Sequence, residues 1–253
     1  MPYYKIDGGS KYFSENDIKF SSDWSPRNIG NIVFWGKPEK RYILRSSNNI
    51  SVWKDNSGMM NDAKQENATN NPSFVDNFVN GYPSIYFQND RFLSIPLTIN
   101  SFTIFTVLKT KNDNIVYEFG DNTNSETGFY LSGDRNSISV SNSGLSNLSS
   151  IKNKGKSWLS DNIWKILTHQ YNGTHLSHKL FINSVYQVLS DYISYNDNPG
   201  DITSTKMLNL GAKSSGLDGT NSYMLEFIVF NKYLSYSEIT NVNNYLNSKY
   251  QIY

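Results

Sequence analysis

The sequence contains no cysteine among its 253 residues. The chain therefore has no cysteine nucleophile, no disulfide framework and no thiolate metal site. Its fold must be held by side-chain packing and hydrogen bonds alone.

The sequence also lacks an excess of charge of either sign. It has 23 Lys and Arg against 22 Asp and Glu, which gives a net charge of +1 at pH 7. Attraction of nucleic acid or anionic lipid needs a clear positive excess, so we expect neither partner. No apolar run approaches membrane-spanning length, so we expect no membrane insertion. The opening MPYYKIDGGSKYF has no basic segment followed by an apolar run, so no signal peptide is expected.

Aromatic residues, in contrast, are abundant: Tyr (18), Phe (14) and Trp (5) make up 15% of the chain. Many lie in short apolar runs that are separated by turns rich in Asn, Ser, Gly and Asp. The run SFTIFTVLKT at 101–110 is largely apolar on both faces, as is typical of a central strand buried between layers. This pattern predicts an all-β fold, a two-sheet antiparallel β-sandwich of the jelly-roll type.

The end of the chain departs from the strand pattern. Ser235 precedes Glu238 by three residues, which is the spacing of a capping box at the start of a helix. Apolar residues then follow at helical spacing and form one stripe: Ile239, Val242, Leu246 and Tyr250. The sequence therefore predicts a short amphipathic helix over 235–250 that packs on a sheet.

Six segments occur in an order that a known family shares. They are VWKDNSG (52–58), NGYPSIYFQNDRFLSIP (80–96), SFTIFTVLKT (101–110), IWKILTHQYNGTHLSHKLFINSVYQ (163–187), LNLGAKSSGLDGTNSYMLEFIVFN (208–231) and EFIVFNKYLSYSEITNVNNYLNSKY (226–250). Together they resemble the laminin-G-like jelly roll of the concanavalin A-like lectin/glucanase superfamily, although Ser184 stands where Gly is more usual. The sequence has no internal repeat and no Gly/Ser linker, so we expect a single domain over 30–253, and residues 1–29, which lack a clear period, form an N-terminal arm.

Some members of this superfamily are glycoside hydrolases, which need two carboxylates close together. The resemblance implies an E-x-D-x-E or E-x-D-x-x-E motif for them, and the chain contains neither. In YEFGD, Glu118 and Asp121 are three residues apart and fall on opposite faces of a regular strand. We therefore expect no catalytic residues and no enzyme activity.

The resemblance implies calcium as the candidate cofactor, because relatives bind it through oxygen atoms of loop Asp and Asn residues. The loops GDNTNSE and GLDGTNS supply the candidate ligands: Asp121, Asn122, Asn124 and Asp218. The alternative is that both loops are ordinary turns, which the same residue types build without a metal.

Three histidines lie close together in the sequence, at His169, His175 and His178. Their H-x-x-H spacing is compatible with a metal site, but no third ligand is evident. We favour a structural role, with one histidine in a strand and two exposed in loops beside a turn.

Sugar binding requires an exposed aromatic side chain that stacks on a pyranose ring, with polar side chains beside it. The candidate platforms are Trp53, Tyr130, Trp158 and Tyr223. The alternative for each is that its side chain is buried in the hydrophobic core, because most aromatic residues of a two-sheet sandwich are buried.

These features favour a non-catalytic structural or adhesion protein of a bacteriophage or other virus. In this interpretation a lectin-like jelly roll is displayed on the virion surface, as capsid decoration or as part of a tail or fibre, after synthesis in the host cytoplasm. Residues 1–29 would bind other virion proteins, and cell-surface glycans are the candidate ligands; a homo-oligomer is a further option. The alternative is a stand-alone bacterial carbohydrate-binding module acting outside the cell, and a glucanase-like glycoside hydrolase is less favoured.

Overall fold

The computed structural model describes residues 24–97, 99, 101–111, 115–119, 128–132, 137–141, 149–152, 161–172, 177–187, 191–194, 207–212 and 219–253. The strands are β1 (Ile32–Gly36), β2 (Ile43–Ser46), β3 (Asn49–Trp53), β4 (Ala63–Lys64), β5 (Ser73–Val79), β6 (Tyr82–Phe87), β7 (Leu93–Ile95), β8 (Phe102–Thr110), β9 (Ile115–Phe119), β10 (Gly128–Ser132), β11 (Ser137–Ser141), β12 (Ser149–Lys152), β13 (Lys165–Tyr171), β14 (Lys179–Ile182), β15 (Val185–Gln187), β16 (Asp191–Ser194), β17 (Leu208–Leu210) and β18 (Ser222–Phe230). The helices are the 3-10 helices η1 (Pro26–Ile29), η2 (Lys40–Tyr42) and η3 (Ala68–Asn70) and the α-helix α1 (Tyr236–Tyr250).

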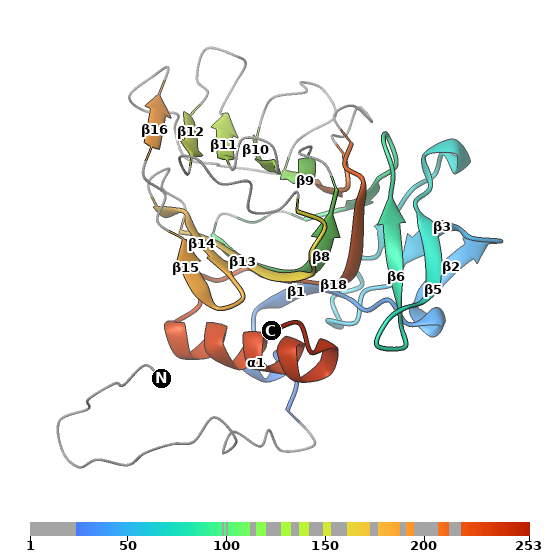
Figure 1. Cartoon of the computed structure of the whole chain (residues 1–253), viewed down its shortest axis with the longest axis horizontal. Helices are drawn as coiled ribbons and strands as arrows, with labels where there is room; N and C mark the ends of the chain where they lie inside the picture. The colour runs from blue at the N-terminus through green and yellow to red at the C-terminus, as the bar shows by residue number, and fades with distance from the viewer. Residues whose placement is uncertain are drawn as a thin grey trace.

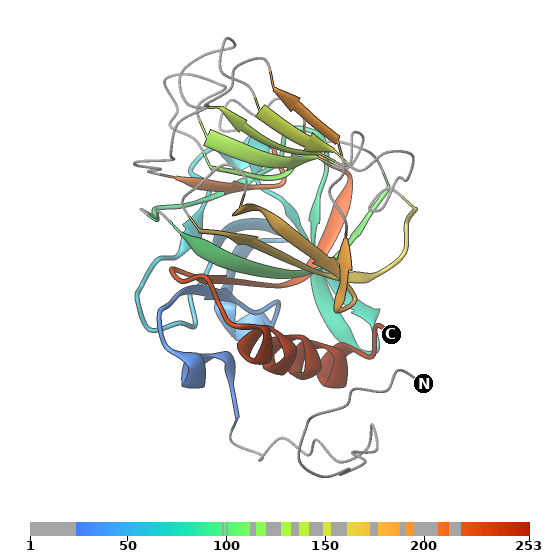
Figure 2. The ribbon, with the colours of Figure 1, turned by 90° about the vertical axis from the view of Figure 1, so that its left-hand side faces the viewer.

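Two antiparallel sheets lie one above the other, and α1 covers the outer face of one of them (Figures 1 and 2). In this helix-side sheet the strand order is β15-β14-β13-β8-β18, and both β1 and β6 pair with the far edge of β18. In the far sheet the order is β16-β12-β11-β10-β9-β17-β7. β5 pairs with the free edge of β6. β3 bonds to β2, β4 and β5, and β4 bonds in turn to β7 of the far sheet, so β3 links the two sheets at one end. The predicted two-sheet antiparallel sandwich is confirmed.

Strand β8 lies at the centre of the helix-side sheet, as its sequence predicts. It pairs with β13 on one side, from Phe102 opposite Tyr171 to Leu108 opposite Lys165. It pairs with β18 along the other side, and eight of its nine residues are buried. Because β8 is covered on both faces and both edges, it fixes the register of its neighbours.

Two apolar clusters fill the spaces between the layers. The inner cluster lies between the sheets and includes the largest buried rings: Phe34, Trp53, Phe87, Phe102, Tyr117, Phe119, Tyr171 and Phe227. The outer cluster lies between the helix-side sheet and α1 and includes Trp35, Phe105, Val107, Ile166, Leu225, Ile228, Phe230, Ile239, Val242, Leu246 and Tyr250. Burying each large apolar side chain contributes about 1.5–3 kcal/mol, so both clusters are major sources of stability.

Helix α1 begins and packs as predicted. The Ser235 side chain accepts a hydrogen bond from the Glu238 amide, and the Glu238 carboxylate accepts one from the Ser235 amide. The predicted apolar stripe is buried against the sheet. Within the described residues, no helix has the length and apolar character needed to span a membrane.

The last part of the predicted N-terminal arm is packed on the domain. Trp24 lies against Tyr245 of α1, with ring centroids 5.8 Å apart. Arg27 of η1 donates to the backbone carbonyl of Asn56, at 2.8 Å from Nε. Residues 24–29 therefore belong to the folded unit, and residues 1–23 lie outside the described part.

Candidate functional site

Trp53, one of the four predicted sugar platforms, is fully buried in the inner cluster. Its ring meets Phe34 edge to face at 5.9 Å, and its Nε1 donates to the Lys37 carbonyl at 2.7 Å. Gly36 packs directly beneath the ring, where a side chain would collide with it. The prediction of Trp53 as an exposed platform is therefore wrong, because both its ring and its polar atom are used inside the fold.

Most of the other predicted site residues are not placed by the structure. Trp158 and the candidate calcium ligands Asp121, Asn122, Asn124 and Asp218 lie outside the described residues. Tyr130 belongs to β10, where its backbone lies opposite Glu118 of β9 and Ser139 of β11. Among the described residues, no three His, Asp or Glu side chains come together as a metal site. Calcium binding at the two loops stays a prediction.

Two of the three histidines belong to the core. His169 is fully buried, its Nδ1 shares a hydrogen bond with the Tyr117 hydroxyl, and its Nε2 lies 2.9 Å from Nδ1 of His178. Burial holds the pKa of His169 well below its ordinary value, and the neighbouring His178 acts in the same direction. His169 is therefore neutral at physiological pH. These contacts agree with the structural role favoured from the sequence, but the expectation that His178 is exposed is wrong, because it is buried against His169. His175 lies outside the described part.

Tyr223, the remaining predicted platform, lies in a line of residues that crosses the helix-side sheet. It stands opposite Tyr86 of β6 on one side and Lys109 of β8 on the other. Since Leu108 of β8 faces Lys165 of β13, the next residue pair along these strands is Lys109 and Trp164. The strand register thus places side chains from four elements next to one another.

The aromatic members of this line contact one another, together with Phe78 from the end of β5. Tyr223 stacks on Tyr86 at 4.4 Å and on Phe78 at 4.2 Å, with interplanar angles of 19° and 18°. Phe78 in turn meets Trp164 edge to face at 6.0 Å. All four side chains are half-buried, and we call Tyr86, Tyr223, Phe78 and Trp164 the aromatic row. Because Tyr223 is covered on both ring faces, the faces available to a ligand are at the ends of the row.

Polar side chains flank the aromatic row. The Lys109 ammonium lies 5.5 Å from the Phe78 ring centre and 5.9 Å from that of Tyr223. No carboxylate within the described part forms an ion pair with it. At the other end Ser73 stands opposite Tyr86, and Arg91 donates to the Ser73 hydroxyl at 2.9 Å. The row therefore combines apolar ring surface with a cation, a hydroxyl and a guanidinium.

The row faces outward, on the same side of the sheet as α1. Ile85, Phe87 and Met224 alternate with Tyr86 and Tyr223 and belong to the inner cluster, so the row points away from it. The helix does not extend over the row, because its last residue, Tyr250, lies against the β5–β6 turn. The row therefore occupies a part of the outer face that α1 and the other described elements leave uncovered.

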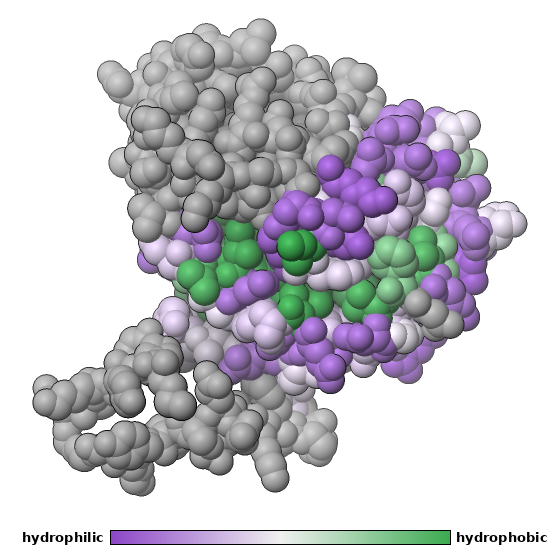
Figure 3. All heavy atoms as spheres, viewed as in Figure 1, coloured by the Kyte–Doolittle hydropathy of each residue, from purple (hydrophilic) through white to green (hydrophobic). Residues whose placement is uncertain are grey.

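Other exposed apolar side chains are distributed over several elements of the described part. They are Leu44, Met59, Met60, Ile163, Val185, Tyr186, Tyr236 and Tyr253. On the face of the molecule that Figure 3 shows, hydrophobic side chains form separate groups surrounded by hydrophilic ones. Single exposed apolar residues are ordinary in soluble folds, so the aromatic row is the stronger candidate.

A buried charged cluster under α1 has a structural role. Glu226 is fully buried and accepts hydrogen bonds from Trp35 Nε1 at 2.5 Å and from the Tyr250 hydroxyl at 2.7 Å. Lys249 forms an ion pair with it at 2.9 Å, and the Tyr245 hydroxyl donates at 3.2 Å. Burial and the Glu226 charge raise the pKa of both tyrosines. The carboxylate fastens the helix to the sheet and has no access to a substrate.

Comparison by sequence finds no match: no family model and no curated protein corresponds to this chain. Comparison by structure finds several. The binding domain of Paraclostridial Mosquitocidal Protein 1 is 17% identical with a TM-score of 0.58, over 88% of this chain and 53% of that one. The receptor binding domain of botulinum neurotoxin D is 14% identical with a TM-score of 0.51, over 88% and 54%. Trypanosoma rangeli sialidase is 10% identical with a TM-score of 0.55, over 87% and 33%.

The shared property is the fold. The chain spans about half the length of the two toxin domains and about a third of the sialidase. At such low identity the likeness establishes a β-sandwich architecture and does not transfer a ligand or a reaction. The β-sandwich fold implied by the sequence resemblance is confirmed at this level.

The sequence identified one member of the aromatic row and missed the other three. Tyr86 carried a usable signal, because it lies between the buried Ile85 and Phe87 and must therefore face outward. Trp164 precedes a strand and carries no such pattern. The contact of Phe78 with Tyr223 depends on the register shift within the β5–β6 pair, which has no sequence signature.

Proposed function

We propose that this chain is a non-catalytic binding domain that holds a glycan along the aromatic row. The observation that carries the proposal is the contact of four aromatic side chains on a sheet face that α1 leaves open, beside the Lys109 ammonium, which pairs with no carboxylate among the described residues. Sugars present C–H groups that pack on aromatic rings and hydroxyls that need polar partners. The row and its flanking side chains supply both.

The geometry assigns different tasks to the members of the row. Tyr223 is enclosed between Phe78 and Tyr86, so it holds these rings in position and offers a ligand only its edge. Tyr86 has the small Ser73 on its other side, where a pyranose can stack on the ring. Arg91 and Lys109 stand at opposite ends of this surface and suit the hydroxyl or acidic groups of a bound chain.

Catalysis is not part of the proposal. Glycoside hydrolysis needs two carboxylates on either side of the scissile bond. The row consists of aromatic side chains with cationic and hydroxyl neighbours, and the carboxylate of Glu226 is enclosed beneath α1. We therefore propose binding without turnover.

The test is a glycan array with the purified chain, followed by calorimetric titration of the bound glycans. We expect Tyr86→Ala and Lys109→Ala each to weaken binding about tenfold, or about 1.4 kcal/mol. Tyr253→Ala is the matched control, because Tyr253 is a 51% exposed tyrosine that follows α1, outside the row. Glycan binding that survives both row substitutions unchanged would refute this assignment.

We also propose, in line with the composition, that the domain is displayed on a phage or virus particle through residues 1–23. Residues 24–29 pack on the sandwich, so a chain that begins at Trp24 keeps these contacts. If the arm is an anchor, this truncated chain binds glycans normally but no longer associates with particles. Normal behaviour in both assays would favour the alternative of a free carbohydrate-binding module.

A further inference from the structure

A concave surface lies at the opposite end of α1 from the aromatic row, beside the helix N-terminus. It is an open depression of about 670 Å³. Its walls come from β13, β14, the β18–α1 connection and the first turn of the helix, and include Gln170, Lys179, Phe181, Lys232, Tyr233 and Tyr236. None of these residues belongs to the aromatic row, so the two surfaces are independent.

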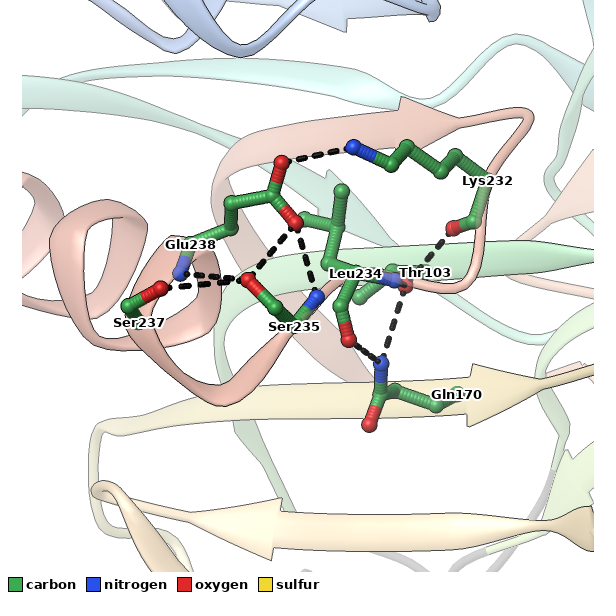
Figure 4. A network of polar contacts seen from close by, with 7 residues as sticks. All are labelled: Thr103, Gln170, Lys232, Leu234, Ser235, Ser237 and Glu238. Atoms are coloured by element: carbon green, nitrogen blue, oxygen red, sulfur yellow. Dashed lines mark hydrogen bonds and ion pairs between the residues drawn. The ribbon is translucent and has the colours of Figure 1, made fainter.

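The floor of the depression is held by a closed hydrogen-bond network around Thr103 (Figure 4). The Thr103 hydroxyl donates to the Lys232 carbonyl at 2.9 Å and accepts from the Leu234 amide at 3.0 Å. Gln170 Nε2 donates to the Leu234 carbonyl at 2.8 Å and to the Thr103 hydroxyl at 3.3 Å. Every backbone group in this set is satisfied, so the connection from Lys232 to Ser235 is fixed in shape.

The same network determines which way the Gln170 amide points. A carbonyl oxygen only accepts hydrogen bonds, so the side-chain atom facing the Leu234 carbonyl must be the nitrogen. The Oε1 atom therefore points away from the network, as Figure 4 shows, and accepts no hydrogen bond from the described residues. Gln170 is only 2% exposed, so this oxygen is a fixed acceptor on a wall of the depression.

The charges around the depression leave one cation uncompensated. Lys232 pairs with Glu238 at 2.6 Å, and the second Glu238 oxygen accepts from the Ser235 amide at 2.7 Å. Lys179 forms no ion pair with a described residue, and its ammonium lies 5.4 Å from the Tyr233 ring. The depression thus offers an ammonium that contacts Tyr233 but pairs with no described carboxylate, together with a fixed acceptor, at one rigid site.

An exposed ring completes the site. Tyr236 is 67% exposed at the first position of α1, and it lines the depression with Tyr233 and Phe181. A large apolar ring left this far in water gains free energy when a ligand covers it.

We propose that this depression binds a carboxylate-bearing sugar residue, as a second saccharide site separate from the aromatic row. The sugar carboxylate pairs with Lys179, a sugar hydroxyl donates to Gln170 Oε1, and the ring packs on Tyr236. The inference extends the proposed glycan-binding function to a second site and a more specific ligand class, but its residues are its own.

The test is a titration of the isotope-labelled full chain, followed by two-dimensional NMR. The probes are the methyl glycosides of glucuronate and galacturonate, with those of glucose and galactose as neutral counterparts. We expect the acidic probes to shift the backbone amides of residues 170, 179 and 233–238. The affinity obtained from these shifts should be at least about tenfold lower for the neutral probes. Lys179→Gln should remove the difference in affinity between acidic and neutral probes. Tyr236→Ala should weaken the binding of all four probes.

Lys64→Gln is the matched control, since Lys64 is an exposed lysine on β4, outside the depression. Equal response to acidic and neutral probes, or unchanged affinity in Lys179→Gln, would overturn the proposal. Because the same spectra report the row amides near residues 86, 109 and 223, the two sites are scored separately. Shifts confined to the row amides would refute the second site and support binding along the row. Shifts confined to the depression would support the second site and refute binding along the row.

Discussion

Removing the charge of Glu226 should destabilise the fold more than almost any other single polar change in the described part of the chain. The carboxylate is fully buried and receives four hydrogen bonds or ion-pair contacts, two at each oxygen. In Glu226→Gln, the remaining oxygen still serves two of these donors. Whichever way the new amide points, its nitrogen faces a group that can only donate, either the Lys249 ammonium or Trp35 Nε1.

The magnitude follows from the environment of Lys249. Breaking a buried ion pair by removing one partner costs about 3–5 kcal/mol. The Lys249 side chain keeps 16% exposure and lies 4.9 Å from the Tyr250 ring centre, so water and the ring compensate part of the loss. We therefore expect Glu226→Gln to lower the free energy of unfolding by about 3 kcal/mol. The change is measured by denaturant unfolding followed by tryptophan fluorescence and circular dichroism.

A double-mutant cycle separates the ion pair from other effects. Lys249→Met alone leaves a buried carboxylate without its cation. The double variant, Glu226→Gln with Lys249→Met, contains neither charge, so no buried charge is left without a partner. We expect the double variant to lose about 2 kcal/mol less than the sum of the single losses. Glu66→Gln, at an exposed carboxylate, is the control and should change stability by less than about 0.5 kcal/mol. Additive losses, or a negligible loss in Glu226→Gln, would refute the reasoning.

Three further predictions concern the core. Gly36→Ala should cost about 1–3 kcal/mol in chemical denaturation, because its Cβ would lie 2.6 Å from ring atoms of the buried Trp53; an unchanged midpoint would show that the ring can move aside. Leu246→Ala should cost about 2–5 kcal/mol by the same assay through the cavity it leaves under α1, and a smaller loss would mean that the helix resettles. His169 is protonated near pH 6.5 in the unfolded chain, but burial opposes its protonation in the folded chain. As pH drops below 6.5, the free energy of unfolding should therefore decrease by up to about 1.4 kcal/mol per pH unit. His169→Asn should flatten this dependence, and an unaltered slope would assign it to other groups.

The elements that the sequence predicted best are those whose local pattern agrees with their final environment. The 101–110 run is apolar on both faces and became the central strand β8, buried on both sides. The capping box at Ser235 and the stripe that follows describe a helix boundary and its buried face, and the structure has both. Local signals of this kind depend on neighbours within one turn or one strand, so a single sequence contains them.

The site was less predictable because it depends on contacts between distant segments. Trp53 looked like any other aromatic residue in a turn-rich region, and its burial depends on Gly36, which leaves space for the ring from a different strand. Tyr223 belongs to the row only because β18 pairs with both β6 and β8 in one particular register. The fixed oxygen of Gln170 likewise depends on Thr103, a residue 67 positions away. Pairing of this range is decided by the whole fold and leaves no local periodicity.

The position of the aromatic row follows from where the outer layer ends. Helix α1 finishes beside the β5–β6 turn, where the Tyr250 carbonyl accepts from Asn80 at 2.8 Å. Beyond that point no described element covers the sheet, and among the described residues its outward rings pack on one another. Such stacking contributes to stability whether or not a ligand binds, so stability and affinity must be measured on the same variants. Tyr223→Ala, in the middle of the stack, should mainly lower stability, whereas Tyr86→Ala, at its end, should mainly lower glycan affinity. A row that serves packing alone would lose stability in both variants and affinity in neither.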